Sequence, residues 1–143
     1  MKIRQSFEQA LCIVLLIKGN EGPMKSHELS QRLNISDSYL KKITRQLVVS
    51  GLISSKASKL GGFVLNKDTK DISLYDIFLA IEGKEHFIES TQLIHKVFPE
   101  YRFEETETMI IDSLHIAEED YLRKLKKINL QQIINEAKKT SNC

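Results

Sequence analysis

The chain has 143 residues, of which 41% are hydrophobic and 28% charged, and its formal net charge is +2. This size and composition predict a globular protein of one domain, or of one domain with an appendage. The apolar run at residues 10–17 is far shorter than the ~20 residues that span a membrane, and no signal-peptide pattern is visible. We therefore expect a cytoplasmic protein without a membrane partner. Two cysteines, Cys12 and Cys143, are too few for a disulfide framework.

The charge is distributed unevenly along the chain. Residues 24–67 carry eight lysines and arginines against two acidic residues, a net charge of +6. Residues 68–143 carry ten lysines and arginines against fifteen acidic residues, a net charge of −5. A local basic face is the electrostatic signature of phosphate binding. A basic segment joined to an acidic tail therefore favours a protein that binds double-stranded DNA.

Hydrophobic periodicity and capping residues predict a mainly α chain with one small β-hairpin. The expected elements are helices at residues 7–18, 26–33, 37–50, 73–82, 90–98, 104–127 and from 130 onwards, and strands at 52–55 and 63–66. The first helix is apolar on every face and should be buried on most sides, with a buried strand as the alternative for so short a run. The expected N-caps are Ser6, Ser26, Ser36 and Asn129, and Ser73 with Asp76 is expected to form a capping box at the start of the fourth helix. Gly51 is expected to end the third helix.

The helices at 26–33 and 37–50 meet at a tight turn containing Asn34 and Ile35. Two such helices form a helix-turn-helix, whose second helix enters the major groove of DNA. The residues at 52–66 add a hairpin, or wing, whose lysines would enter the adjacent minor groove and whose glycines let the backbone approach phosphates. The predicted DNA-contacting residues are Ser26, Ser36, Ser38, Tyr39, Lys41, Lys42, Arg45, Lys56, Lys59, Gly61 and Gly62. The alternative is a packed helix pair with a solvated charged face.

The helix at 104–127 is preceded by a segment, residues 84–104, that shows little pattern. The helix itself carries apolar residues at intervals of three and four, and the series continues just beyond it: Ile110, Leu114, Ala117, Tyr121, Leu125 and Ile128. A repeat close to 3.5 residues favours a dimer interface, with an intrachain core stripe as the alternative. We therefore divide the chain into a DNA-binding domain at 1–83 and a helical dimerisation and effector region at 84–143.

Several motifs recur together in the first 83 residues. They are Ile35-Ser36-x-Ser38-Tyr39-Leu40, Leu47 to Gly51-Leu52-Ile53, Ser55, Gly61-Gly62-Phe63-x-Leu65, Ile72-Ser73-Leu74-x-Asp76-Ile77 and Ala80-Ile81-Glu82-Gly83. In these motifs the chain resembles the Rrf-two family of bacterial winged-helix transcriptional regulators. The resemblance implies a winged helix-turn-helix domain and a homodimer whose long C-terminal helix crosses its partner. It also implies binding to a palindromic operator, most often as a repressor.

The wing and the first helix depart from the family pattern. Ala57 and Ser58 stand where the family wing usually holds Arg-Gly, so the arginine that relatives insert into the minor groove is missing. Lys56 or Lys59 would take its place less specifically, because lysine lacks the guanidinium fork. Gln9 stands where an aromatic residue is common.

The third departure concerns iron. Cluster-binding members of the family hold an iron–sulfur cluster with three cysteines, whereas residues 84–104 contain none. We therefore expect neither a cluster nor another metal or cofactor. His86 and His95 lack the spacing of metal ligands and are interpreted as surface histidines. Cys12 is interpreted as a small core residue, and Cys143 as an exposed terminal thiol.

No catalytic motif appears, so we do not expect an enzyme. The rival hypothesis is a protein-interaction module, in which the winged helix is a scaffold and the acidic tail or residues 84–104 dock a partner protein. A further alternative is a small-molecule effector bound in a pocket between Ile88 and Tyr101. A partner protein could also be the signal that controls a DNA-binding regulator.

Overall fold

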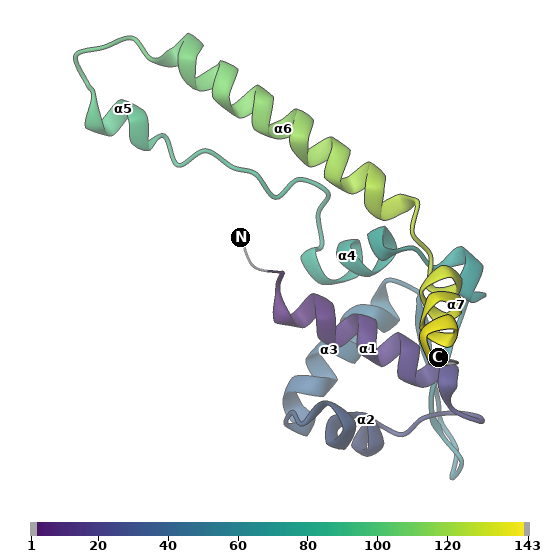
Figure 1. Ribbon diagram of the computed structural model, residues 1–143. Helices are drawn as coiled ribbons and strands as arrows, with labels where there is room; N and C mark the ends of the chain where they lie inside the picture. Colours follow the sequence, from purple (N-terminus) through teal and green to yellow (C-terminus); the bar gives the residue numbers. More distant parts are fainter. Residues whose placement is uncertain (1–2, 142–143) are drawn as a thin grey trace.

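The computed structural model describes residues 3–141 of the chain. Its elements in chain order are α1 (Gln5–Gly19), α2 (Ser26–Leu33), α3 (Asp37–Val49), β1 (Ile53–Lys56), β2 (Gly62–Leu65), η1 (Thr69–Asp71), α4 (Leu74–Glu82), α5 (Leu93–Val97), α6 (Glu104–Lys126) and α7 (Leu130–Ser141) (Figure 1). The strands β1 and β2 pair antiparallel, with Ser54 opposite Val64 and Lys56 opposite Gly62. The mainly α fold with one small hairpin is therefore confirmed, and the 3₁₀ turn η1 is an addition.

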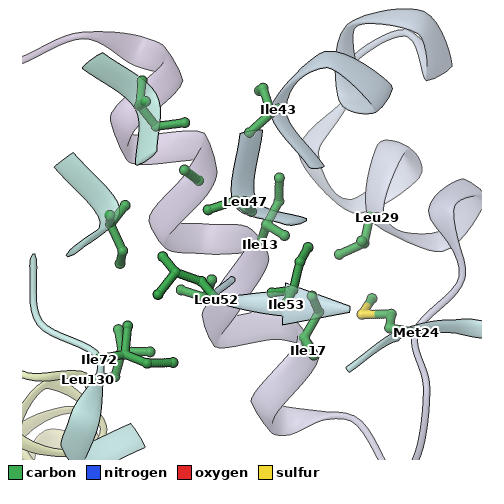
Figure 2. Packing of buried hydrophobic residues seen from close by; sticks show 14 of the residues in the cluster. Ile13, Ile17, Met24, Leu29, Ile43, Leu47, Leu52, Ile53, Ile72 and Leu130 are labelled. Atoms are coloured by element: carbon green, nitrogen blue, oxygen red, sulfur yellow. The ribbon is translucent and has the colours of Figure 1, made fainter. Parts of the chain in front are cut away.

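Helix α1 forms the centre of the N-terminal unit. Ala10, Ile13 and Val14 are fully buried, and α3, α4 and β2 pack around this helix. Figure 2 shows Ile13 close to Leu47 of α3, with Leu52 and Ile53 beside them. The helical prediction for this run is confirmed and the strand alternative is excluded. Its start is two residues earlier than expected, so Arg4 rather than Ser6 is the N-cap.

Cys12 is exposed, which corrects its interpretation as a core residue. It lies on the side of α1 opposite Val14, which is buried under the neighbouring helices. Because the run is apolar on all faces, its sequence alone carries no information about which face those helices cover. Cys143 lies outside the described residues.

Helices α4 and α7 each begin at a capping box, in which two residues exchange hydrogen bonds between side chain and backbone amide. Ser73 and Asp76 form a capping box, in which the Ser73 amide donates to the Asp76 carboxylate at 2.8 Å. Asn129 and Gln132 cap α7 in the same way, each accepting from the other's amide at 2.9 Å. Leu130 of α7 is fully buried against Ile72, so α7 packs back on the N-terminal unit (Figures 1 and 2).

Helix α6 contacts the N-terminal unit through α4 and then extends away from it, with α5 alongside its outer part (Figure 1). Helix α5 is shorter than the helix expected at 90–98, and it ends two residues before Pro99, which disfavours helical geometry in the residue before it. Among the described residues, no helix combines the length and hydrophobicity needed to cross a membrane.

Candidate nucleic-acid interface

The turn between α2 and α3 is fixed by its own backbone and side chains. Asn34 adopts the left-handed conformation with φ of 52°, which ends α2. The Ile35 amide donates to the Ser30 carbonyl at 3.1 Å, and the Ser30 hydroxyl donates to the carboxylate of Asp37 in the first turn of α3. Ser36 caps α3 as expected by accepting from the amide of the third residue after it at 3.2 Å. These bonds set the angle between the two helices.

Helix α3 has one buried face and one basic face. Leu40, Ile43 and Leu47 are buried in the main core, as their spacing predicts. The residues on the other face are all exposed: Ser38, Tyr39, Lys41, Lys42 and Arg45. Within residues 3–141, the three cations of this face form no salt bridge. Their charge is therefore available to an anionic partner.

The two acidic residues of the basic segment are occupied by internal hydrogen bonds. Glu28 accepts from the backbone amide of Lys25 at 3.0 Å, which makes Lys25 the N-cap of α2. Ser26 is therefore the first residue of the helix rather than its cap, and it is exposed. Asp37 accepts from Ser30. The carboxylates thus stabilise the helix starts, and in the part of the chain that the structure describes neither forms a salt bridge with a cation of α3.

The wing places Lys56 and Lys59 in solvent beside the tip residue Leu60, which is 83% exposed. Its two glycines are required by contacts inside the chain. A Cβ at Gly61 would lie 2.2 Å from the carbonyl oxygen of Lys56, and one at Gly62, whose φ is +154°, would lie 2.6 Å from the Met24 carbonyl oxygen. The tight turn and the bridge to Met24 therefore account for both glycines without an approaching phosphate.

The apolar series on α6 divides between two faces. Ala117 and the large residues Ile110, Leu114 and Tyr121 are exposed, with Ile110 and Leu114 each 43% accessible. Leu125 is 9% accessible and packs against Phe78 and Leu122 of its own chain, which corrects its assignment to a dimer interface. Ile128 lies beyond the end of α6 and is half-buried, and its carbonyl accepts from the Leu74 amide at 2.9 Å.

Glu118, on the inner face of α6, was not predicted as a functional residue. Its side chain is fully buried, and its carboxylate accepts from the backbone amides of Phe87 and Ile88, the latter at 2.9 Å. It also lies 3.0 Å from Nδ1 of His86. Burial disfavours the charged form, but the bonds from Phe87, His86 and Ile88 outweigh it and lower the pKa of Glu118. Residues 86–88 are thereby attached to α6.

A second contact joins the same segment to α6 closer to its N-terminus. Glu107 accepts from the Ser90 hydroxyl and pairs with His95. The Ser90 hydrogen bond, followed by the contact with His95, lowers the pKa of the Glu107 carboxyl despite some desolvation. The two histidines interpreted as surface residues are therefore both partners of α6 glutamates.

A sequence signal for these contacts exists. The inward residues of α6 recur at intervals of three and four: Glu107, Ile111, His115, Glu118, Leu122 and Leu125. Polar residues on a stripe that ends in buried leucines indicate that the facing segment supplies hydrogen-bond partners. The neighbouring stripe of apolar residues, on which the sequence prediction rests, does not reveal these contacts.

Comparisons with known proteins agree on one family. The family model described as "Rrf2: Iron-dependent Transcriptional regulator" matches residues 3–136. A protein of Lactococcus lactis named "Putative HTH-type transcriptional regulator YffB" is 35% identical over 144 residues, which cover 99% of this chain and 92% of that protein. A protein of Bacillus subtilis named "Putative HTH-type transcriptional regulator YwgB" is 40% identical over 100 residues, which cover 68% of this chain and 64% of that protein.

Solved structures share the fold at lower identity. CymR, the global cysteine regulator of B. subtilis, superposes with a TM-score of 0.69 at 22% identity and covers 95% of this chain and 98% of that one. IscR of T. potens superposes with a TM-score of 0.59 at 21% identity, covering 96% and 88%. The chain therefore belongs to the Rrf2 (Rrf-two) family of transcriptional regulators and has a winged helix-turn-helix fold.

Proposed function

We propose that this regulator is a homodimer that binds double-stranded DNA at a palindromic operator and acts as a repressor. One observation carries the proposal: Lys41, Lys42 and Arg45 are exposed on a helix whose opposite face is buried, and no salt bridge among the described residues neutralises them. Unpaired cations on a helix that fits the groove displace counterions from DNA when they contact its phosphates, and this release contributes a large share of the binding free energy.

The same face offers groups for sequence reading. The serine-capped start of α3, with Ser38 and Tyr39, would approach base edges, while the three cations contact phosphates or guanines. The wing would place Lys56 and Lys59 at the adjacent minor groove. Because these are lysines, we propose that the wing contributes affinity more than sequence preference.

Dimerisation would supply the second recognition helix. Ile110, Leu114, Ala117 and Tyr121 form an exposed, largely apolar stripe on α6, and such stripes are costly in water unless they are covered. Two-fold pairing along it would set two copies of α3 about 34 Å apart, one turn of DNA. A palindromic operator follows from that symmetry.

We further propose that the regulator works without an iron–sulfur cluster, although the family description names iron. Residues 84–104 contain no cysteine, and within residues 3–141 no group of three or more His, Cys, Asp or Glu side chains is arranged to hold a metal. Instead, Glu118 and Glu107 attach this segment to α6 by hydrogen bonds. These carboxylates accept hydrogen bonds from backbone amides and a serine hydroxyl, whereas iron–sulfur clusters are held by cysteine thiolates.

The proposal is tested by selecting bound sites from a random duplex pool and titrating the selected duplex by fluorescence anisotropy at several salt concentrations. In the proposed homodimer, Lys42→Ala with Arg45→Ala removes two contacts of about 1–3 kcal/mol each from both subunits, so affinity should fall by roughly 1000-fold or more. Because four cations are removed from the dimer, the slope of log affinity against log salt should become less steep by about 4.

The matched control is Lys124→Ala with Lys127→Ala, which removes the same charge from the end of α6. Its affinity should stay within about threefold of the unaltered chain, since long-range effects of surface charge are screened. Equal losses in both double variants would refute the placement on α3. A pool that yields no enriched site, or a complex insensitive to salt, would overturn DNA binding itself and favour the protein-interaction module.

A further inference from the structure

A pocket of about 320 Å³ lies where the N-terminal end of α1 meets α4 and α6. The residues that line it are Ile3, Arg4, Phe7, Phe78, Glu82, Phe87 and Tyr121. The rings of Phe78, Phe87 and Tyr121 meet edge to face, with centroids 5.7 to 6.1 Å apart. The sequence allowed a small-molecule pocket between Ile88 and Tyr101 as an alternative. The observed pocket borders that region, through Phe87, but does not lie within it.

Glu82 is the acidic group of this pocket. Its side chain is 15% exposed, and its Oε2 lies 3.2 Å from Nη1 of Arg4, whose side chain is 70% exposed. The ion pair therefore joins a sheltered carboxylate to a solvated guanidinium. Pairs with one partner so exposed are weak, because water and salt compete for the free side chain. Another cation that also gains apolar contacts can displace Arg4.

We propose that this pocket binds a small organic ammonium ion with an aromatic or aliphatic body. The ammonium group would pair with Glu82 in place of Arg4, and the body would lie among the rings of Phe7, Phe78 and Tyr121. Aromatic rings offer the body of such a ligand a large apolar contact area. An apolar pocket with few polar groups is also the usual form of a small-molecule site. A carboxylate ligand is disfavoured by Glu82 itself.

The position of the pocket suits a regulatory ligand. Its walls come from the start of α1 and the residues just before it, from α4, from α6 and from Phe87. The backbone amide of Phe87 donates a hydrogen bond to the carboxylate of Glu118. A bound ammonium ion would therefore contact both the DNA-binding unit and the helix that carries the exposed stripe. Any effect on operator affinity rests on the proposed function, but ligand binding does not.

Ligand binding is tested on the full chain, without DNA, by NMR titration with three probes of similar shape: 2-phenylethylammonium, 2-phenylethanol and 3-phenylpropanoate. The cation should saturate and bind at least about tenfold more tightly than the other two, since a hydrogen bond to a charged group favours it. Glu82→Gln should weaken the binding of 2-phenylethylammonium by about tenfold or more. Arg4→Ala should raise the affinity for 2-phenylethylammonium about two- to fivefold, because Arg4 no longer competes for the Glu82 carboxylate.

Glu100→Gln, at an exposed position between α5 and α6, is the matched control and should leave all three affinities unchanged. The proposal is overturned if the three probes bind equally, if 3-phenylpropanoate binds most tightly, or if Glu82→Gln has no effect. The proposal is also overturned if no probe shows saturable binding, which is the result expected if a partner subunit fills the pocket. If circular dichroism shows that Glu82→Gln does not fold, the Arg4→Ala variant decides. Binding of 2-phenylethylammonium to that variant that is unchanged or weaker then contradicts the proposal.

Discussion

Glu118→Ala is expected to release residues 86–88 from α6 without unfolding the protein. The substitution removes the carboxylate that accepts from the amides of Phe87 and Ile88 and that lies beside His86. The main core, which includes Ile13 and Leu47, does not contain this carboxylate. The segment can therefore open locally, which is how regions with few core contacts lose structure.

The size of the effect follows from the hydrogen bonds lost. A hydrogen bond to a charged group contributes about 1.5–3 kcal/mol, which corresponds to a factor of roughly 10 to 150 in the opening equilibrium. Because Phe87 and Ile88 share one carboxylate oxygen, they should open together and show similar factors. Glu118→Gln, which keeps an acceptor oxygen but loses the charge, should give a smaller increase in opening.

The assay is amide hydrogen exchange, resolved residue by residue. In Glu118→Ala the amides of Phe87 and Ile88 should exchange at least about tenfold faster, while the amide of Ile13 in the main core keeps its rate within about threefold. Glu119→Ala, at the adjacent exposed position, should change neither. Unchanged exchange at Phe87 and Ile88, or the same acceleration in Glu119→Ala, would contradict the proposed attachment.

Three further outcomes can be measured on the same chain. Gly62→Ala should lower the free energy of unfolding, measured in urea, by about 1–3 kcal/mol, because its Cβ would lie 2.6 Å from the Met24 carbonyl oxygen at a φ of +154°. Gly19→Ala is the control: no atom lies within 4 Å of its added Cβ, so the substitution should be neutral or stabilising. Leu114→Glu should convert the dimer to a monomer in sedimentation, with unchanged helix content; a persistent dimer would rule out this stripe as the interface. The pKa of Glu118 is lowered because its hydrogen bonds outweigh burial, so its contribution to stability is complete above the unfolded pKa of about 4.3 and is lost as the pH falls through the lower folded pKa. The difference in unfolding free energy between the unaltered chain and Glu118→Gln should therefore shrink below about pH 4, and a constant difference would contradict the assignment.

Local patterns of the sequence predicted the elements of the winged-helix unit and several of their caps. Ser36 caps α3, and Asn129 and the Ser73–Asp76 pair act as expected, because a cap depends on residues three positions apart. The buried and basic faces of α3 follow from its 3.6-residue period alone. The cap of α2 was misplaced by one residue because Glu28 binds a backbone amide that any residue can supply.

Contacts between distant segments were decided only by the tertiary structure. Whether a residue of an all-apolar helix such as Cys12 is buried depends on which face its neighbours cover, and Leu125 differs from Leu114 only in the element that faces it. The partners of Glu118 are about thirty positions away. Helical period and capping act within one turn and can be read from the chain, whereas burial of a particular face depends on how elements far apart in the sequence pack together.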